Sequence, residues 1–194
     1  KAANFQRFWQ NRLFGDTIHV PRKDGFVFVP LQGRLMEQRS FQYCSPIDMI
    51  HAVLRHDPVR PVIATLHPSE TYQPDEERAL EQLLAENDRL YIRKGDPDRY
   101  LRTCDYIVSQ NSGVALQGFF FNKPAILFGR SDFHHIALNV ADIGAEAAFG
   151  MVARHAPDFA AYLYWFLQMQ AINAGRPEAQ DRIAQVLRGH GWPV

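Results

Sequence analysis

The sequence predicts an α/β protein with a doubly wound, mainly parallel sheet of the Rossmann type, followed by C-terminal helices. Three observations predict it. Short apolar segments, typical of strands buried on both faces, recur along the chain. Segments with helical spacing of apolar residues separate them, about every 30 residues, which is the rhythm of βαβ units. Polar residues follow the strands, as they do where an open parallel sheet binds its ligand.

The strand predictions rest on short runs of apolar residues. Five runs are predicted to be buried strands, and a loop over residues 133–140 could end in one more short strand. Parallel strands are joined by right-handed crossovers, so helices are expected on both faces of the sheet. The five runs cover residues 26–30, 61–66, 90–92, 106–108 and 125–129.

Capping residues indicate where helices begin. Ser45 can cap a helix whose first turn accepts Pro46, and another helix begins at Pro74 with acidic residues in its first turn. Two helices are predicted to close the chain, over residues 158–171 and 177–188. The first of these is unusually aromatic, a pattern that more often indicates core or interface packing than a cofactor site.

The chain is large enough for one substantial core, with 194 residues of which 46% are hydrophobic. We expect three segments. Residues 1–25 carry aromatic and basic side chains and form either a lead-in helix or an interdomain linker. Residues 26–157 form the Rossmann-like domain. Residues 158–194 form a helical extension that packs on it.

Charge and composition argue against several classes of protein. Lys plus Arg and Asp plus Glu balance at 21 each, so no overall field favours nucleic acid. No apolar run approaches the roughly 20 residues of a membrane span, and no leader sequence opens the chain. Two cysteines far apart in sequence suit a reduced compartment. Dinucleotide, P-loop and nucleophile-elbow motifs are missing. No metal site is expected at His134 and His135, because neighbouring histidines seldom bind one ion and no cysteine or carboxylate cluster accompanies them.

The most informative feature is the turn between the strand at 106–108 and the helix after it, which reads Ser109-Gln110-Asn111-Ser112-Gly113. Unpaired backbone N–H groups and the positive end of the helix dipole meet there, and such a position binds phosphate or another anion. The serines and the asparagine could equally serve only as helix caps, which is the usual role of these residue types.

Polar residues also follow the other predicted strands. Gln32 follows the first strand, His67 and Pro68 the second, Lys94 the third and Arg130 the last. Because the carboxyl ends of parallel strands meet at one edge of the sheet, we expect these residues around the same turn. Cations and a histidine beside a helix N-terminus suit an anionic ligand such as a nucleotide phosphate. Each of them could instead be a solvated surface residue.

Five segments carry a resemblance to a known family. They read FVPLQ (28–32), LHP (66–68), DYIVSQNS (105–112), NKPAILFGR (122–130) and YLYWFL (162–167). In this order and spacing they resemble the capsule polysaccharide synthesis proteins, which are bacterial glycosyltransferases of the Kps type that transfer Kdo from CMP-Kdo. The resemblance covers most of the chain from about residue 26 to the end, and it rests on the order of the motifs because each one is short.

The resemblance implies the two-domain GT-B architecture, in which the C-terminal Rossmann-like domain holds the nucleotide-sugar donor. This chain resembles that C-terminal half alone. The acceptor, a glycan or glycolipid, is therefore expected to bind through an N-terminal domain that is missing here, and the fragment is expected to be incomplete for turnover. The resemblance also implies a cytoplasmic location, with the inner face of the inner membrane as an option, and no metal cofactor.

The resemblance assigns roles to individual residues. The family's His-Pro pair, which contacts the nucleotide phosphate, falls on His67 and Pro68, so His67 is the expected catalytic residue. The loop near the donor sugar falls on residues 130–134. We expect four residues in the vicinity of the sugar: Gln32, Lys94, Arg130 and His134. The family's phosphate-binding turn falls on Ser109, Asn111, Ser112 and Gly113.

One position departs from the pattern. Many related glycosyltransferases carry a glutamate in the helix after the turn, where it bonds the donor ribose, and Gln117 stands at that position here. A neutral amide can still hydrogen-bond a hydroxyl group, although less strongly than a carboxylate. We therefore keep Gln117 among the expected nucleotide-binding residues.

The leading hypothesis is a donor-binding domain of a metal-independent glycosyltransferase, with a CMP-sugar, and CMP-Kdo in particular, as the donor. His67 and the helix end at Ser112 would stabilise the charge that grows on the leaving CMP phosphate. Two alternatives stay open. One is a UDP-sugar transferase or epimerase of the same architecture. The other is a non-catalytic interaction module that docks through the helix near Trp165 and the basic, aromatic N-terminus.

Overall fold

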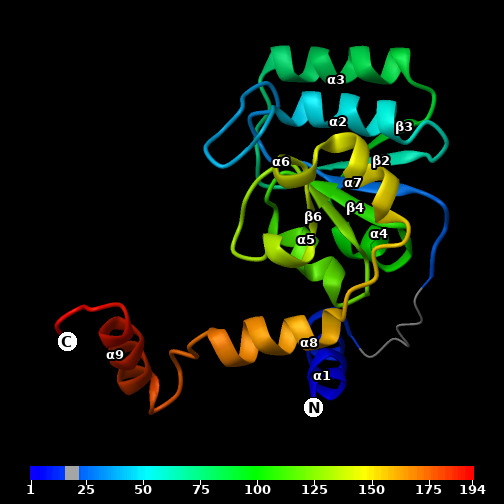
Figure 1. Cartoon of the computed structure of the whole chain (residues 1–194). Coiled ribbons are helices and arrows are strands. Elements are labelled where there is room, and N and C mark those ends of the chain that lie inside the picture. Colours follow the sequence, from blue (N-terminus) through cyan, green and yellow to red (C-terminus); the bar gives the residue numbers. More distant parts are fainter. Residues whose placement is uncertain (16–21) are drawn as a thin grey trace.

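The computed structural model describes residues 1–15 and 22–194 and confirms the predicted fold class (Figure 1). Six parallel strands form one sheet in the order β3-β2-β1-β4-β5-β6. The short sixth strand is present, and the third strand is longer than predicted. The strands are β1 (Val27–Pro30), β2 (Val62–Leu66), β3 (Leu90–Lys94), β4 (Tyr106–Ser109), β5 (Ala125–Leu127) and β6 (Leu138–Asn139).

Helices cover both faces of the sheet, as a parallel sheet requires. In Figure 1, α2 and α3 lie above the sheet, and α5 and α8 lie below it. Helix α7 packs into the same core as α2 and α3, and α4 packs into the same core as α5 and α8. Bounds of the α-helices are α1 (Ala2–Phe14), α2 (Pro46–His56), α3 (Pro74–Glu86), α4 (Pro97–Thr103), α5 (Gly113–Phe119), α6 (Val140–Ile143), α7 (Ala145–Val152), α8 (Phe159–Tyr164) and α9 (Ala179–Gly189).

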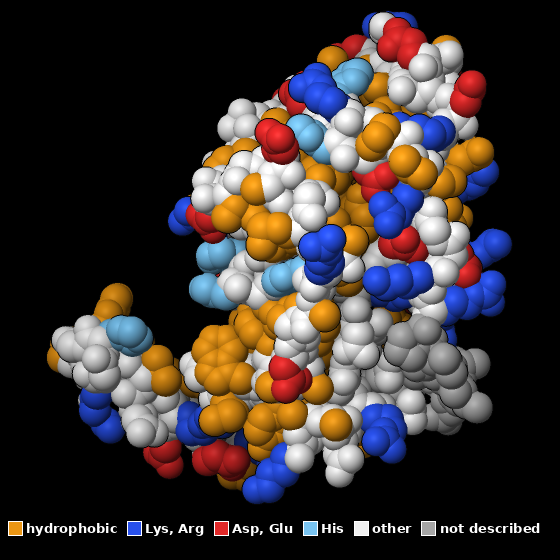
Figure 2. All heavy atoms as spheres, turned by 45° about the vertical axis from the view of Figure 1, so that its right-hand side comes forward, with side chains coloured by type: hydrophobic (Ala, Val, Ile, Leu, Met, Phe, Trp, Pro, Cys, Tyr) orange, Lys and Arg blue, Asp and Glu red, His pale blue; other side chains and the backbone are white. Residues whose placement is uncertain are grey.

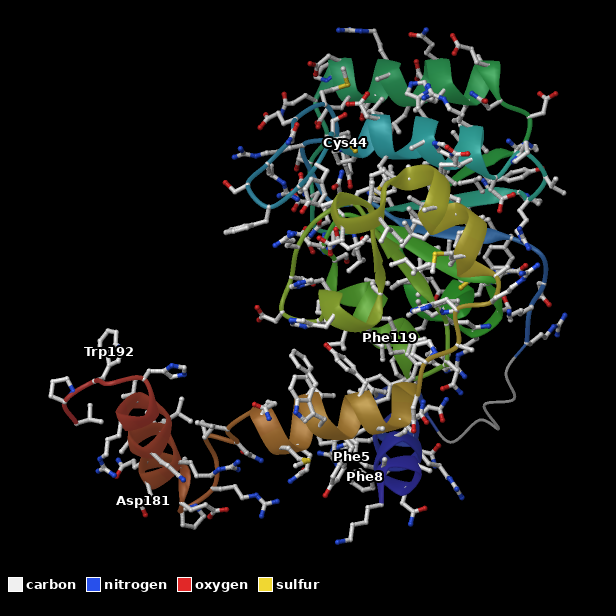
Figure 3. The ribbon with its side chains drawn as sticks, viewed as in Figure 1. Phe5, Phe8, Cys44, Phe119, Asp181 and Trp192 are labelled. Carbon is white, nitrogen blue, oxygen red and sulfur yellow. The ribbon has the colours of Figure 1, made fainter. Side chains whose placement is uncertain are left out.

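The alternation of side chains along β1 produces two separate hydrophobic cores. Val27 and Val29 face one side and pack with α2, α3 and α7. Phe28, between them in sequence, faces the other side and packs with residues of α4, α5 and α8. All three side chains are fully buried, which explains why the strand is apolar at every position. Figure 3 shows one anchor of the second core, Phe119, between α5 and α8, where its ring stacks on that of Phe159.

The predicted helix starts are confirmed by the geometry of their caps. The Ser45 hydroxyl accepts a hydrogen bond from the backbone N–H of Asp48 at 3.1 Å, with Pro46 in the first turn of α2. At the start of α3, Gln73 and Glu76 form a capping box around Pro74. Each cap satisfies N–H groups that the first turn of a helix leaves without intrahelical acceptors.

The C-terminal part of the chain differs from the prediction in two respects. The helix expected over 158–171 divides into α8 and a π-helix, η2 (Trp165–Gln170). Two helices that the sequence analysis did not identify, α6 and α7, lie between β6 and α8. The last helix, α9, projects away from the sheet with only Ala179 buried, and Figure 3 shows Asp181 and Trp192 on this projecting part.

The opening segment contains a helix, α1, that packs against α8. The rings of Phe5 and Tyr164 meet edge to face at 5.5 Å, and the side chains of Gln6 and Gln10 donate to the Phe120 carbonyl at the end of α5. The α1 helix therefore lies on the same side of the sheet as the second core. Residues 16–21 of the expected lead-in segment lie outside the described residues.

A network of ion pairs occupies the amino edge of the sheet, where the strands begin. Arg60 donates to the carboxylates of Asp57 at 2.9 Å and Asp105 at 2.8 Å. The Tyr106 hydroxyl donates to Asp57 at 2.5 Å, and Arg89 donates to three backbone carbonyls nearby. Burial by itself would raise the pKa of Asp57, but the hydrogen bonds from Tyr106 and Arg60 and the charge of Arg60 outweigh it, so this pKa is lowered.

Candidate functional site

The turn after β4 is held by its own hydroxyl groups. Ser109 is fully buried, and its hydroxyl oxygen accepts from the backbone N–H of Ser112 at 3.4 Å. Ser112 caps α5 by accepting from the N–H of Val114 at 3.2 Å. The N–H groups of Asn111 and Gly113 have no acceptor among the described residues. Helix α5 has only seven residues, so its dipole contributes little. The turn is suitable for an anion mainly because of these free N–H groups.

The loop after β2 presents His67 to solvent. The Nδ1 atom of His67 accepts a hydrogen bond from the backbone N–H of Ser69 at 3.3 Å, and the N–H of His67 donates to the Tyr72 hydroxyl at 2.9 Å. An accepting Nδ1 assigns the proton of the neutral ring to Nε2. The adjacent Pro68 is exposed as well. His67 can therefore donate a hydrogen bond from Nε2 to an anion that reaches this loop.

A glycine lets the loops after β1 and β2 approach each other. A β-carbon at Gly33 would lie 2.4 Å from a carboxylate oxygen of Glu70, which is closer than real contacts allow. The Glu70 side chain thus packs directly over the Gly33 backbone, one residue after Gln32. This contact places the loop that carries His67 beside the loop that carries Gln32.

The loop over residues 31–44 is fixed at both of its ends. Near its start, the backbone N–H of Leu35 donates to the buried Glu76 carboxylate of α3. Near its end, Gln42 forms an antiparallel bridge with Gly129, and the N–H of Tyr43 donates to the Phe128 carbonyl at 2.8 Å. The loop is therefore a fixed wall of the site that connects β1 to the end of β5.

A polar cavity of about 590 Å³ lies between this loop and the turn after β4. Its volume is in the range of small-molecule sites. Three buried polar atoms in or beside this cavity have no hydrogen-bond partner among the described residues. Oε1 of Gln32 and Nε of Arg39 belong to residues that line the cavity, and Oε1 of Gln110 lies in the adjoining turn. Such unpaired atoms are costly to bury, and a bound ligand would satisfy them. The lining residues are Gln32, Arg34, Glu37, Gln38, Arg39, Ser40, Gln42 and Asn111.

A second cavity, of about 550 Å³, lies on the other side of the α5 N-terminus, between α1, α5 and the segment from η2 to α9. Gly113 and Gln117 line it together with apolar side chains that include Trp9 and Phe120. Figure 2 shows hydrophobic side chains gathered on the lower part of the molecule, at the height of α8 in Figure 1. The N-terminal turn of α5 therefore separates a polar cavity from a largely apolar one.

Three of the residues expected near the donor sugar do not line the polar cavity. Lys94 ends the edge strand β3, in register with Leu66 of β2. Arg130 is exposed and bonds the Asp142 carboxylate and the Tyr43 hydroxyl, each at 3.0 Å. His134 begins the short 3₁₀-helix η1 (His134–Ile136), where its ring stacks on that of His135. Of the expected sugar-binding set, the polar cavity contains Gln32 alone.

Two residues of this region, although they lie in the polar segments that follow the first two strands, were not among the expected site residues. Arg39 lines the polar cavity, and Glu70 packs over Gly33 beside it. A signal for Arg39 was present, since the loop after the first strand is rich in charged residues. Nothing in the sequence indicated that Glu70 would meet a glycine of another loop, because that contact depends on how the two loops fold.

The two cysteines are poor candidates for a reactive group. Burial raises the pKa of the Cys44 thiol to about 11 and that of the Cys104 thiol to about 12, so both are protonated near neutral pH. In the described part of the chain, three or more His, Cys, Asp or Glu side chains do not gather in a group that could hold a metal ion. Within the same residues, each helix is too short or too polar to cross a membrane.

The parallel sheet defines a Rossmann-like protein, and the polar cavity at the carboxyl ends of its strands is a candidate ligand site at the usual edge. The family described as "Capsule polysaccharide biosynthesis protein" matches residues 2–176, and the chain belongs to this family. The resemblance to that family noted in the sequence is therefore confirmed. A search of curated proteins finds none that matches.

Solved structures also resemble the chain. One is KpsC of Thermosulfurimonas dismutans, a beta Kdo 2,7 transferase, with 15% sequence identity and a TM-score of 0.50 over 88% of this chain. The aligned region is 61% of that protein's chain, so this chain spans less than two thirds of its length. Another is S. aureus MnaA in a structure with UDP, with 12% identity, a TM-score of 0.42, and coverage of 78% of this chain and 47% of that one. At such low identity, the likeness to KpsC establishes the fold alone.

Proposed function

We propose that this chain binds the CMP-sugar donor, with CMP-Kdo as the expected one, of a glycosyltransferase that makes capsule or another surface polysaccharide. Membership of the capsule polysaccharide family supports the general activity. The observation that carries the proposal is the polar cavity between Gln32 and Asn111, where buried side-chain atoms of Gln32 and Arg39 lack partners among the described residues. It adjoins free backbone N–H groups at the Asn111–Gly113 turn, where a phosphate would be held.

In this proposal, His67 and the turn after β4 stabilise the leaving CMP. The Nε2–H group of His67 donates to the phosphate, and the N–H groups of Asn111 and Gly113 donate to the same group. These donors are positioned before the reaction begins, so they stabilise the charge that develops as the glycosidic bond breaks. Gln117, on the far side of the turn, would bond a ribose hydroxyl. Donors of these kinds can stabilise the leaving group without a metal cofactor.

The acceptor in this proposal is a glycan or glycolipid, and it binds through a further domain of the kind that completes a GT-B enzyme. The reaction would take place in the cytoplasm, at the inner face of the inner membrane if the acceptor is a lipid. The chain alone would then bind donor without completing transfer. Mixing this chain with donor and a glycan or glycolipid acceptor and measuring CMP release would test this point, since steady turnover by the chain alone would contradict it.

Calorimetric titration with CMP tests the central part of the proposal. We expect wild type to bind CMP and His67→Ala to bind it about 10-fold to 100-fold more weakly, because a charge-assisted hydrogen bond contributes about 1.5–3 kcal/mol. The matched control is His51→Ala, which removes an exposed histidine of α2 outside both cavities. Equal CMP affinity for wild type and His67→Ala would disprove the role of His67.

A thermal-shift comparison of CMP with UDP tests the nucleotide. Ligand that binds the folded state raises the apparent melting temperature by mass action. A larger shift with CMP supports the proposal. A larger shift with UDP would favour a UDP-sugar transferase or epimerase, and no shift with either nucleotide would favour an interaction module.

A further inference from the structure

Arg39 is the cation of the polar cavity that the protein itself leaves without a partner. Its Nε atom is buried and has no hydrogen-bond acceptor among the described residues, and no carboxylate there forms an ion pair with it. Its backbone, by contrast, is fixed, since the N–H of Arg39 donates to Oε1 of Gln42 at 3.0 Å and its carbonyl accepts from the N–H of Gln42. The backbone of Arg39 is therefore held in place while its guanidinium lacks an anion.

The other charges of the cavity are already paired. Arg34 donates to the Glu37 carboxylate at 3.3 Å, and both side chains are mostly exposed. This pair is therefore neutral overall and well solvated, so it offers little to a ligand. Arg39 alone, among the cavity residues that the structure describes, combines a formal charge with a buried and unpaired donor.

The wall that carries Arg39 is held rigidly against the end of β5. The backbone N–H of Arg130 donates to the Phe41 carbonyl at 2.8 Å, and a β-carbon on Gly129 would lie 2.8 Å from that same carbonyl oxygen. Both contacts hold the backbone two residues beyond Arg39. A fixed wall lowers the entropy cost of binding, because the loop does not have to be ordered when a ligand arrives.

The chemistry of the unpaired atoms describes the ligand. A guanidinium presents N–H donors in a planar fork that matches a carboxylate. Oε1 of Gln32 needs the opposite kind of partner, a donor such as a sugar hydroxyl. A sugar acid carries both groups on a compact frame, and it is the ligand of this kind that suits a nucleotide-sugar donor. In the function proposed above, His67 and the turn after β4 bind the phosphate, so the cavity beyond Asn111 can hold the sugar.

We propose that Arg39 binds the carboxylate of an acidic donor sugar while Gln32 accepts a hydrogen bond from one of its hydroxyl groups. This inference rests on the proposed function and goes beyond it, because it assigns the recognition of the acidic sugar to a residue outside the motifs of the family. Arg39 is then the residue that distinguishes acidic from neutral donor sugars.

The experiment compares CMP-Kdo with CMP in calorimetric titrations of wild type, Arg39→Gln and Arg34→Gln. We expect Arg39→Gln to weaken CMP-Kdo binding by about 10-fold to 100-fold and to leave CMP binding within about twofold of wild type. Arg34→Gln removes the same charge from the same cavity but from an existing ion pair. It should leave both affinities within about threefold, which separates a specific contact from a general loss of positive charge.

Two further measurements keep the outcome interpretable. The melting temperature of Arg39→Gln should match that of wild type, because the Arg39 guanidinium forms no hydrogen bond or ion pair within the described residues. Arg39→Lys keeps the charge and loses the planar fork, so it should recover only part of the CMP-Kdo affinity.

Each remaining outcome counts against the inference. An equal loss of CMP and CMP-Kdo affinity in Arg39→Gln would mean that Arg39 binds the phosphate, and an unchanged CMP-Kdo affinity would mean that it binds nothing. If wild type binds CMP but Arg39→Gln gives either of these two results, the inference fails and the proposed function stands. If wild type binds neither ligand, both fail together.

Discussion

The two edges of the sheet handle their polar groups in opposite ways. At the amino edge, Asp57, Arg60 and Asp105 form ion pairs, and Tyr106 donates to the first of them. At the carboxyl edge, some polar groups are paired, but several polar atoms are buried without partners among the described residues. Five buried side-chain atoms lack a partner in the described part of the chain, and four of them belong to loops that follow β1, β4 or β5: Gln32, Arg39, Gln110 and Ser131.

This difference separates stability from function in one molecule. A buried polar group with a partner contributes to the stability of the fold, whereas one without a partner costs free energy that natural selection tolerates where a ligand can offset it. The same strands form both edges, so the amino-acid composition of the strands does not explain the contrast between the edges. We infer that the amino edge stabilises the sheet and that the carboxyl edge is set up for binding.

The largest expected effect comes from breaking the amino edge. Asp57→Asn removes a buried carboxylate from Arg60 and Tyr106, and we expect the free energy of unfolding to fall by about 3 kcal/mol, since removing one partner leaves the others unsatisfied. Urea denaturation measures the change. CMP affinity, measured in parallel, should stay within about twofold of wild type. A large loss of CMP affinity in a folded Asp57→Asn protein would contradict the separation of the two edges.

The same substitution has a pH signature. The pKa of Asp57 is lowered in the folded protein, so its contribution is fully present above the ordinary aspartate pKa of about 3.9 and is lost as the pH falls through the folded value. The difference in stability between wild type and Asp57→Asn should therefore be constant near neutral pH and shrink below about pH 4. A difference that is unchanged at pH 3 would show that the Asp57 charge is not responsible.

An intermediate effect is expected at the carboxyl edge from Gly129→Ala. A β-carbon there would lie 2.8 Å from the Phe41 carbonyl and 3.0 Å from the Gln110 carbonyl, and both are backbone atoms that cannot turn away. We expect the free energy of unfolding to fall by about 2 kcal/mol, as other overpacked sites do. Because the two carbonyls belong to opposite walls of the site, CMP affinity should fall as well. The control is Gly150→Ala in α7, where a β-carbon meets no atom within 4 Å.

The smallest effect on stability is expected from Gln32→Leu. The side-chain oxygen of Gln32 has no partner among the described residues, so we expect the free energy of unfolding to change by less than about 0.5 kcal/mol in either direction. Binding of CMP-Kdo should nevertheless weaken, because leucine cannot accept a hydrogen bond. Thermal unfolding and calorimetry together decide the matter. A clear loss of stability would show that Gln32 has a structural role, as the paired groups of the amino edge do.

Much of the fold was predictable because it depends on local patterns. The apolar run at 26–30 indicated a strand buried on both faces, and Ser45 with Pro46 indicated where α2 begins. Helix α7 was missed, since its short run of alanines carries no clear periodicity or cap. The π-helix after Tyr164 was missed as well, because the spacing of aromatic residues does not distinguish a π-helix from the α-helix that it continues.

The candidate site was predictable only in outline. Its position at the carboxyl edge follows from the parallel topology, which brings Gln32 and the turn of Asn111 together. The sequence placed Arg130 and His134 near the same ligand, and the structure puts them outside the polar cavity. Charged side chains that follow a strand can turn either toward the crevice or toward a partner on the surface. Asp142 is such a partner for Arg130, and it comes from a helix that the sequence did not reveal.

By itself, the sequence determined the class of fold and the order of the main strands and helices, because these depend on periodicity, on caps and on the handedness of parallel crossovers. It also indicated the edge of the sheet at which we propose that a ligand binds. Only the tertiary structure decided which polar groups are paired and which are free. Pairing depends on distances between residues far apart in the chain, such as Arg60 with Asp105, or Gly129 with Phe41. The same kind of residue can therefore serve two purposes: Arg60 forms ion pairs that stabilise the fold at the amino edge, whereas we propose that Arg39 binds a ligand at the carboxyl edge.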